Sequence, residues 1–420
     1  WLLSEQNSAA FLAPCDTPFA NEIVEENCKT GNPALEWDIS GAGDSSIQGF
    51  ATDISVNRGG TISFKVDTDA SSIQIKIYRL GYYNGDGARL IATIPDTSTT
   101  VSAQPACTNS GAPDYLIDCG GWSVSGSWTA TDDTYAPSKP AVSGLYVARL
   151  ERTDSTNGSS HIPFIVRDDT GGSDLLFKTS DTTWQAYNQY GGYSLYAGPA
   201  IPNGGHAHKV SYNRPFTTRD TPVEDNPFNA EYPMIRWLER NGYNISYLSS
   251  VDADRIGTEL LEHKVVMSVG HDEYWSAGER TAFEAARDAG RNLAFFSGNE
   301  VYWKTRWEDN HRTLVSYKEG DAQGSNEHWD CFGNFNCDPD STVWTGLWRQ
   351  NQTGHDGGQP ENSLTGQISW ADETTAIEVP ATATGLRFWR NTGMSAATTL
   401  TADTLGYEFD WEQPAFASSN

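Results

Sequence analysis

Hydrophobic and polar residues alternate in short runs between residues 36 and 168. The runs cover residues 47–56, 61–66, 73–80, 144–150 and 161–166, with glycine and asparagine turns between them. Alternation with a period of two is typical of strands that bury one face. We therefore predict an immunoglobulin-like antiparallel β-sandwich over residues 36–168, preceded by an irregular N-terminal arm at residues 1–35.

The pattern changes after a polar linker at residues 168–172. Apolar runs that predict buried strands now alternate with amphipathic stretches that predict helices. Strands are expected at residues 174–180, 243–248, 264–269 and 292–297, and helices at residues 233–240, 252–261 and 277–289. Alternating β and α units are typical of a mostly parallel sheet. The sequence thus predicts an α/β plus β fold, with a mostly parallel three-layer α/β domain at residues 173–420 that is loop-rich beyond Glu300.

The most informative stretch runs from residue 265 to residue 275. It begins with an apolar, β-branched run, which is typical of a strand buried on both faces. After a glycine it continues with three side chains able to bind or titrate, His271, Asp272 and Glu273. Ser276 and Glu279 then have the spacing of a helix-capping box. The three side chains should lie at the carboxyl end of a strand, where open α/β sheets bind ligands.

Two further loops should reach the same edge of the sheet. They follow the strands that end near residues 180 and 297. With Asp272 from the loop described above, the candidates for a shared pocket are Tyr187, Asn188, Asn299 and Glu300. Each side chain also has a structural explanation. Asp272 can cap the following helix, the tyrosines can be core residues, and Glu300 can pair with Arg306. His206 and His208 have a spacing that suits metal binding if they lie in a strand.

The chain is strongly acidic. It has 420 residues, enough for two or three domains, and its 28 Lys and Arg against 55 Asp and Glu give a formal net charge of −27. Such a surface repels phosphate backbones and anionic lipids, which argues against nucleic acid as a partner. No apolar run approaches the roughly 20 residues needed to span a bilayer.

The six cysteines fall into three local pairs, Cys15 with Cys28, Cys107 with Cys119, and Cys331 with Cys337. None has the C-x-x-C spacing of a metal site, so we predict three disulfides and an oxidising compartment. A first residue that is not Met fits a removed signal peptide. We therefore expect a secreted protein, with glycosylation permitted at the sequons of Asn157, Asn244 and Asn351.

Five motifs together resemble a known family. They occupy residues 183–188, 211–216, 270–276, 298–303 and 405–410. In this order they are similar to the large subunit of N,N-dimethylformamidase and its relatives, and the resemblance covers about residues 170 to 415. The family enzyme acts inside the cell with a separate small subunit, in contrast to the exported chain predicted here.

The resemblance implies a mononuclear non-haem iron, with another divalent metal as the alternative. Two tyrosinates and one glutamate would hold it, and they would be Tyr187, Tyr212 and Glu273, with Tyr190 and Tyr193 as alternatives to Tyr212. Such hard oxygen donors suit ferric iron. His271 would lie beside the metal, and Glu408 matches the glutamate expected to act as general base.

Three functional hypotheses follow. The first is a secreted metal-dependent hydrolase that cleaves non-peptide amide bonds with a metal-activated water. The second is a non-catalytic extracellular protein that binds glycans or forms part of a surface. The third is a carbohydrate-active enzyme with Glu273 and Glu300 as paired carboxylates. A small molecule or a glycan is the expected ligand, and the sequence does not predict the oligomeric state.

Overall fold

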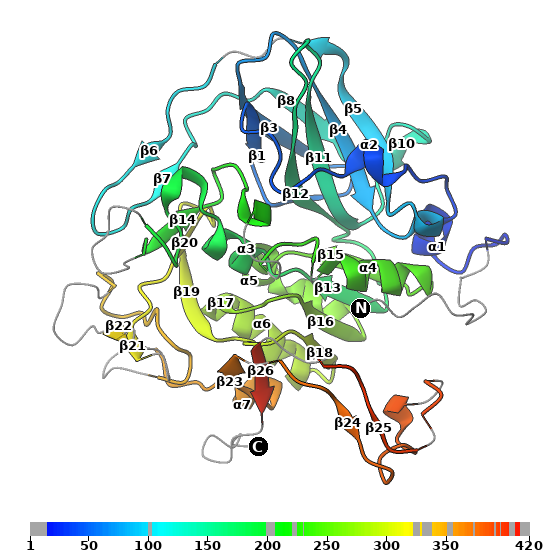
Figure 1. The fold of residues 1–420 in the computed structure, drawn as a ribbon, viewed down its shortest axis with the longest axis vertical. Helices are drawn as coiled ribbons and strands as arrows, with labels where there is room; N and C mark the ends of the chain where they lie inside the picture. The colour runs from blue at the N-terminus through cyan, green and yellow to red at the C-terminus, as the bar shows by residue number, and fades with distance from the viewer. Residues whose placement is uncertain are drawn as a thin grey trace.

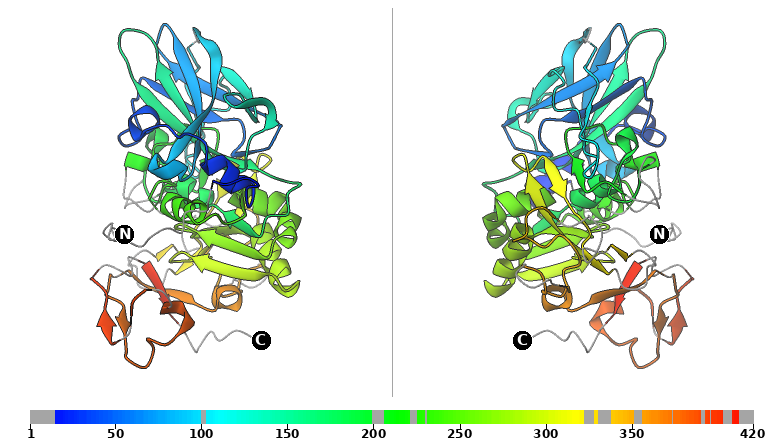
Figure 2. Two further views of the ribbon diagram at one scale, coloured as in Figure 1. Left: turned by 90° about the vertical axis from the view of Figure 1, so that its right-hand side faces the viewer. Right: turned by 90° about the vertical axis from the view of Figure 1, so that its left-hand side faces the viewer.

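The chain has a β-rich mixed α/β fold with several sheets and few helices (Figure 1). The computed structural model describes residues 15–99, 103–198, 206–220, 225–229, 231–321, 328–329, 338–350, 356–372, 374–389, 392–394, 396–402 and 408–411. Along the long axis the N-terminal sheets come first, then a parallel sheet with its helices, and then the C-terminal strands, an order also visible in both side views of Figure 2.

Two sheets in the N-terminal part enclose one core. The three-stranded sheet has the order β1-β3-β8, with β1 (Ile47–Ala51), β3 (Thr61–Thr68) and β8 (Gly126–Thr129). The five-stranded sheet has the order β2-β12-β11-β4-β5, with β2 (Ser55–Asn57), β12 (Ser159–Arg167), β11 (Gly144–Arg152), β4 (Ile73–Leu80) and β5 (Ala88–Thr99). Alternate residues of β3 are buried, as the period-two pattern predicts. Against the antiparallel expectation, the short β2 pairs with β12 in parallel.

A four-stranded sheet follows in which every neighbouring pair is parallel. Its order is β15-β13-β16-β18, with β15 (Ile245–Leu248), β13 (Leu175–Lys178), β16 (Val265–Val269) and β18 (Asn292–Phe296). The predicted strands at residues 264–269 and 292–297 are therefore neighbours in one sheet. The helices of this part are α3 (Asp181–Tyr187), α4 (Glu231–Arg240), α5 (Ser250–Arg255) and α6 (Ala277–Asp288).

A second four-stranded sheet lies beside the first. Its order is β14-β20-β19-β17, with β14 (Lys209–Ser211), β20 (Thr313–Val315), β19 (Trp303–Glu308) and β17 (Tyr274–Ser276). Short elements make up the rest of the described C-terminal part: β21 (Gly320–Asp321), β22 (His328–Trp329), α7 (Asn362–Thr365), β23 (Ile368–Asp372), β24 (Glu378–Val379), β25 (Thr398–Thr399) and β26 (Glu408–Trp411). These short elements agree with the loop-rich C-terminal part expected from its weak periodicity.

The N-terminal arm is partly helical and joins the two halves of the molecule. Its helices are α1 (Glu22–Asn27) and α2 (Ala34–Trp37). Next to α1, the guanidinium of Arg79 on β4 and the carboxylate of Glu239 on α4 form an ion pair with both side chains 0% exposed. This pair ties the N-terminal sheets to the α/β part. Every helix among the described residues is too short or too polar to cross a lipid bilayer.

Two of the three predicted disulfides are confirmed, Cys15–Cys28 and Cys107–Cys119. Both are compatible with an extracellular protein. Cys331, Cys337 and the sequon residue Asn351 lie outside the described residues. Asn157 is exposed in a turn and Asn244 is half-buried just before β15. The immunoglobulin-like type of the N-terminal sheets, the three-layer arrangement, the domain boundaries and the glycosylation stay predictions.

Candidate functional site

The connection between β16 and β17 carries the central candidate residues. Gly270 turns the chain with a φ of +116°, in the left-handed region that favours glycine. A Cβ atom there would lie 2.5 Å from the Ser180 hydroxyl and 2.7 Å from the Glu231 carboxyl carbon, so a larger residue would have to displace these side chains. The three residues that follow cross from the parallel sheet to the neighbouring sheet that contains β17. The site therefore lies at the junction of two sheets.

Two tyrosine hydroxyls converge on the carboxylate of Glu273. Tyr187 donates to Oε2 at 3.2 Å, and Tyr196 donates to Oε1 at 2.5 Å. The two rings stack, with their centroids 4.2 Å apart. Only 3% of Glu273 is exposed. Three oxygen-bearing side chains thus meet, a buried carboxylate and two partly buried phenols.

The backbone around this group is held on several sides. The Glu273 amide donates to the Thr183 hydroxyl on α3 at 3.1 Å. The Glu273 carbonyl accepts from the amides of Tyr302 and Trp303 at 3.1 and 2.8 Å. The Leu195 amide donates to the carbonyl of Ala186 at 2.9 Å, which ties the residue before Tyr196 to the end of α3. Helix α3 and the 271–273 connection therefore set the positions of all three side chains.

His271 lies beside the carboxylate and is oriented by an aspartate. Its Nδ1 atom is 2.8 Å from Oδ1 of Asp225, and its Nε2 atom is 3.7 Å from Oε2 of Glu273. Its ring centroid is 5.7 Å from that of Tyr187. Contact with a carboxylate through one ring nitrogen fixes the tautomer and directs the other nitrogen. Asp225 did not emerge from the sequence, because no motif marks it.

A buried lysine covers the second tyrosine. The Nζ atom of Lys318 lies 3.3 Å from the ring centroid of Tyr196 and 5.0 Å from that of Trp303. Lys318 is only 1% exposed. Burial, followed by the Glu273 carboxylate, raises the pKa of the Tyr196 hydroxyl well above its ordinary value. A nearby cation favours the ionised phenol, so the lysine acts against this rise.

Tyr212 lies away from this group. Its hydroxyl donates to Oδ2 of Asp181 at 2.9 Å, at the start of α3, and its ring packs 5.6 Å from that of Trp307. The alternatives Tyr190 and Tyr193 do not take its place either. Tyr190 packs against a disulfide, and Tyr193 stacks on Tyr115. The structure therefore brings Tyr196, which the sequence did not single out, to the position expected for Tyr212.

Asp272 points into a different cluster, buried beside the site. It accepts from Lys178 and from Ser268, and the same lysine donates to Glu279 at 2.7 Å. The Ser268 hydroxyl also lies 2.7 Å from Oε1 of Glu300. Burial raises the pKa of the Glu279 carboxyl to about 8, although Lys178 opposes this rise. Helix α6 is capped by the Ser276 side chain, which accepts from the Glu279 amide. Asp272 therefore neutralises a buried lysine and does not cap that helix.

The remaining candidates have separate positions. The Asn188 amide donates to the carbonyl of Pro215 at 3.0 Å, which fixes the loop after α3. Asn299 is 7% exposed and has a φ of +55° in the loop after β18. The backbone of Glu408 begins β26, but its side chain lies outside the described part. His206 and His208 are buried with ring centroids 5.3 Å apart, and burial lowers the pKa of His208 to about 4.

The donor set at Glu273 fits a hard metal ion. Within the described ranges, no group of three or more His, Cys, Asp or Glu side chains is placed to hold a metal ion. The phenols of Tyr187 and Tyr196 are further oxygen donors next to the Glu273 carboxylate. Phenolate and carboxylate oxygens are hard anionic ligands of the type that ferric iron prefers. Two phenols and one carboxylate are the types of ligand that the family resemblance implies, but the second phenol here is Tyr196 and not the expected Tyr212.

Comparison with known proteins identifies one family. The family model described as N,N-dimethylformamidase beta subunit-like, C-terminal, matches residues 74–417. No curated protein matches the chain. Among solved structures, a cycloisomaltooligosaccharide glucanotransferase from Paenibacillus sp., complexed with cycloisomaltoheptaose, aligns with 11% identity and a TM-score of 0.17. The alignment covers 64% of this chain and 29% of that one, and a likeness this low carries no argument.

Proposed function

The chain belongs to the N,N-dimethylformamidase beta subunit-like family, and on this premise we propose that it is a hydrolase of non-peptide amide bonds. The convergence of Tyr187 and Tyr196 on the Glu273 carboxylate carries the proposal. These three residues would hold a mononuclear non-haem iron, with a divalent metal as the alternative. Bound there, the ion would supply positive charge that ionises the phenols and makes water a nucleophile at neutral pH.

Other residues of the site would transfer protons and stabilise charge. His271 contacts Asp225 through Nδ1, and its Nε2 atom lies 3.7 Å from Oε2 of Glu273, where the imidazole would act as general base toward an incoming water. Lys318 lies over the face of Tyr196 and favours its ionised form. The burial of Glu273 keeps bulk water away from these charges and so strengthens their interactions. Glu408 is proposed as a further general base on the family resemblance alone.

The natural substrate is proposed to be a small amide, the substrate class that the family points to. We also propose that the protein is secreted, with the Cys15–Cys28 and Cys107–Cys119 disulfides as support. The shared core of the two N-terminal sheets supports the finer proposal of an immunoglobulin-like sandwich. The parallel strand pairs and their helices support a three-layer α/β arrangement.

The decisive experiment compares two tyrosine substitutions. Purified protein is analysed for iron and for the visible charge-transfer absorption that tyrosinate gives with ferric iron. Tyr196→Phe removes one of the two phenols that contact Glu273, so iron content and absorption should both fall. Tyr212→Phe removes a phenol that contacts Asp181, so it serves as the matched control and should keep both. A wild-type protein without metal, or loss of iron only in Tyr212→Phe, would refute the proposal.

A further inference from the structure

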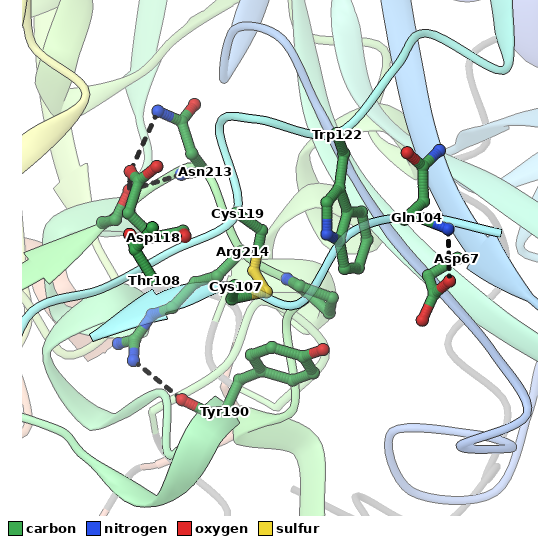
Figure 3. Close-up of a disulfide and its surroundings, with 12 residues drawn as sticks. Asp67, Gln104, Cys107, Thr108, Asp118, Cys119, Trp122, Tyr190, Asn213 and Arg214 are labelled. Atoms are coloured by element: carbon green, nitrogen blue, oxygen red, sulfur yellow. Dashed lines mark hydrogen bonds between the residues drawn. A yellow bond between two sulfur atoms is a disulfide. The ribbon is translucent and has the colours of Figure 1, made fainter.

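We propose that residues 103–122, here called the disulfide arm, position the chain segment that joins Tyr187 to Tyr196. The inference rests on the proposed role of these tyrosines as metal ligands, and it adds a positioning element from a distant part of the chain. The arm leaves the N-terminal sheets, runs through the short strands β6 (Thr108–Asn109) and β7 (Ile117–Asp118), and is closed by the Cys107–Cys119 disulfide (Figure 3).

The base of the arm is anchored to the N-terminal sheets. The Gln104 side-chain amide donates to the carbonyl of Val66 on β3 at 3.0 Å. The Trp122 indole donates to the carbonyl of Pro105 at 2.8 Å, and its ring packs 5.5 Å from that of Phe50 on β1. The disulfide joins the two sides of the arm just beyond these anchors and so restricts the motion of the tip relative to the sheets.

The tip of the arm covers the segment between the two tyrosines. Tyr115 stacks on Tyr193 with ring centroids 5.3 Å apart and planes 9° apart. A Cβ atom added to Gly191 would lie 2.8 Å from the Ile117 side chain, so the two chains are in close contact there. Tyr190 packs against the two cysteines, as Figure 3 shows. Three residues of the segment are thus held by the arm directly.

The arm also holds the arginine that organises the same segment. Oδ2 of Asp118 accepts from the Asn213 side-chain amide at 3.2 Å, and the Cys119 amide donates to the Asn213 carbonyl at 2.7 Å (Figure 3). The next residue, Arg214, is 1% exposed. Its guanidinium donates to the carbonyls of Gln185, Asn188, Tyr190 and Tyr193, at 3.2, 2.7, 3.1 and 2.8 Å.

The arm also contacts the chain next to Lys318. The Tyr317 hydroxyl donates to Oδ1 of Asp114 at 2.7 Å, and the His208 amide donates to the Asp114 carbonyl at 3.0 Å. Tyr317 immediately precedes Lys318, whose ammonium covers Tyr196. The arm therefore contacts both the segment that joins Tyr187 to Tyr196 and the segment that carries Lys318. Ligand groups must be held within about 0.5 Å for metal binding, and a loop with glycines at 191 and 192 does not supply this restraint alone.

The test compares the two disulfides. The double variant Cys107→Ser and Cys119→Ser opens the arm, and Cys15→Ser with Cys28→Ser removes the other disulfide as a matched control. In metal-free protein, hydrogen exchange is measured at the backbone amides of Ser194, Leu195 and Ala207. These amides donate hydrogen bonds to the carbonyls of Ala197, Ala186 and Ser194, respectively. We expect exchange at least about tenfold faster when the arm is opened, and unchanged exchange in the control. The ferric absorption of metal-loaded protein should also weaken or shift only in the arm variant.

A second variant keeps the inference falsifiable if the opened arm does not fold. Tyr115→Ala leaves the disulfide intact and removes the stack on Tyr193, so it should accelerate exchange at the same amides. Unchanged exchange in every arm variant that folds would overturn the inference. The exchange measurement needs no metal, so a wild-type protein that binds no iron would refute the proposed function and leave the positioning result to be decided separately.

Discussion

At the scale of single residues, the site depends on how charge is shared around Glu273. Two partly buried phenols donate to one buried carboxylate, and a buried ammonium lies over the face of one of them. Without a metal the carboxylate favours the protonated phenols, whereas the lysine favours ionisation of Tyr196. This balance suits the proposed metal site, in which the phenols would lose their protons only when the ion binds.

Lys318→Met tests this balance. Methionine keeps a flexible side chain but removes the charge, and a buried cation over an aromatic ring contributes about 2 kcal/mol. We expect ferric iron to bind at least roughly tenfold more weakly, because ionised Tyr196 loses this stabilisation. The tyrosinate absorption should move to longer wavelength, since the phenolate gives up an electron more easily. Absorption spectra and iron titrations measure both. Lys76→Met, which removes a lysine paired with Glu151, is the control and should match wild type.

The sequence predicted about half of this group of residues. Tyr187, His271 and Glu273 were found because His271 and Glu273 follow a strand that the apolar pattern marks, and Tyr187 lies in a motif after another such strand. Tyr196 was missed because it follows a loop without periodicity. Asp225 and Lys318 were missed for a different reason, since only long-range packing brings them to His271 and Tyr196.

At the scale of elements, α3 and α4 are joined through a buried carboxyl group. Glu231, the first residue of α4, accepts from the Ser180 amide and from the Trp184 indole. The sequence predicted a loop where α3 forms, because residues 181–186 are all buried and show no amphipathic pattern. It also predicted one helix over residues 252–261. The chain instead breaks near Gly257, where a Cβ atom would lie 2.4 Å from that of Ala282 on α6.

Glu231→Gln probes the pH dependence of this junction. Burial raises the pKa of the Glu231 carboxyl from 4.5 to about 7. The folded state thus holds a proton that the unfolded state releases, and wild-type stability should fall as the pH rises from about 4.5 through 7. The corresponding free energy is at most roughly 3 kcal/mol. The glutamine variant lacks this titration and should lose less stability between pH 5 and pH 8 in urea unfolding.

The matched control for that measurement is Glu284→Gln on α6. Glu284 is a partly exposed partner of Arg280, and its substitution makes the same change in net charge. Its stability should follow the wild-type pH dependence. An equal change in both variants would mean that net charge, and not the buried carboxyl group of Glu231, causes the effect.

At the scale of the whole molecule, one carboxylate connects three parts of the chain. Glu239 accepts from Arg79 on β4, from the Tyr247 hydroxyl on β15 and from the Asn27 amide on α1. The period-two runs predicted the strands of the N-terminal part individually. They carried no information about the contact between Arg79 and Glu239, because these residues are 160 positions apart. In the sequence, nothing distinguishes either of them from a charged residue on the surface.

Glu239→Gln should destabilise the whole molecule. It leaves the Arg79 guanidinium fully buried without its counter-charge, which typically costs about 3–5 kcal/mol. The unfolding midpoint in denaturant should drop accordingly, as followed by tryptophan fluorescence. The double variant Arg79→Met with Glu239→Met removes both charges and should recover most of the loss. If Glu239→Gln unfolds at the wild-type midpoint, this ion pair does not hold the two parts together.

The long separation between the site residues also has a consequence for biosynthesis. Glu273 is translated 86 residues after Tyr187 and 77 residues after Tyr196. A growing chain folds from its N-terminus. The N-terminal sheets, whose last strand ends at Arg167, can therefore assemble before Glu273 has been synthesised. The proposed iron would therefore find no complete ligand set until the ribosome has passed residue 273, so it would bind only after that stretch has been synthesised.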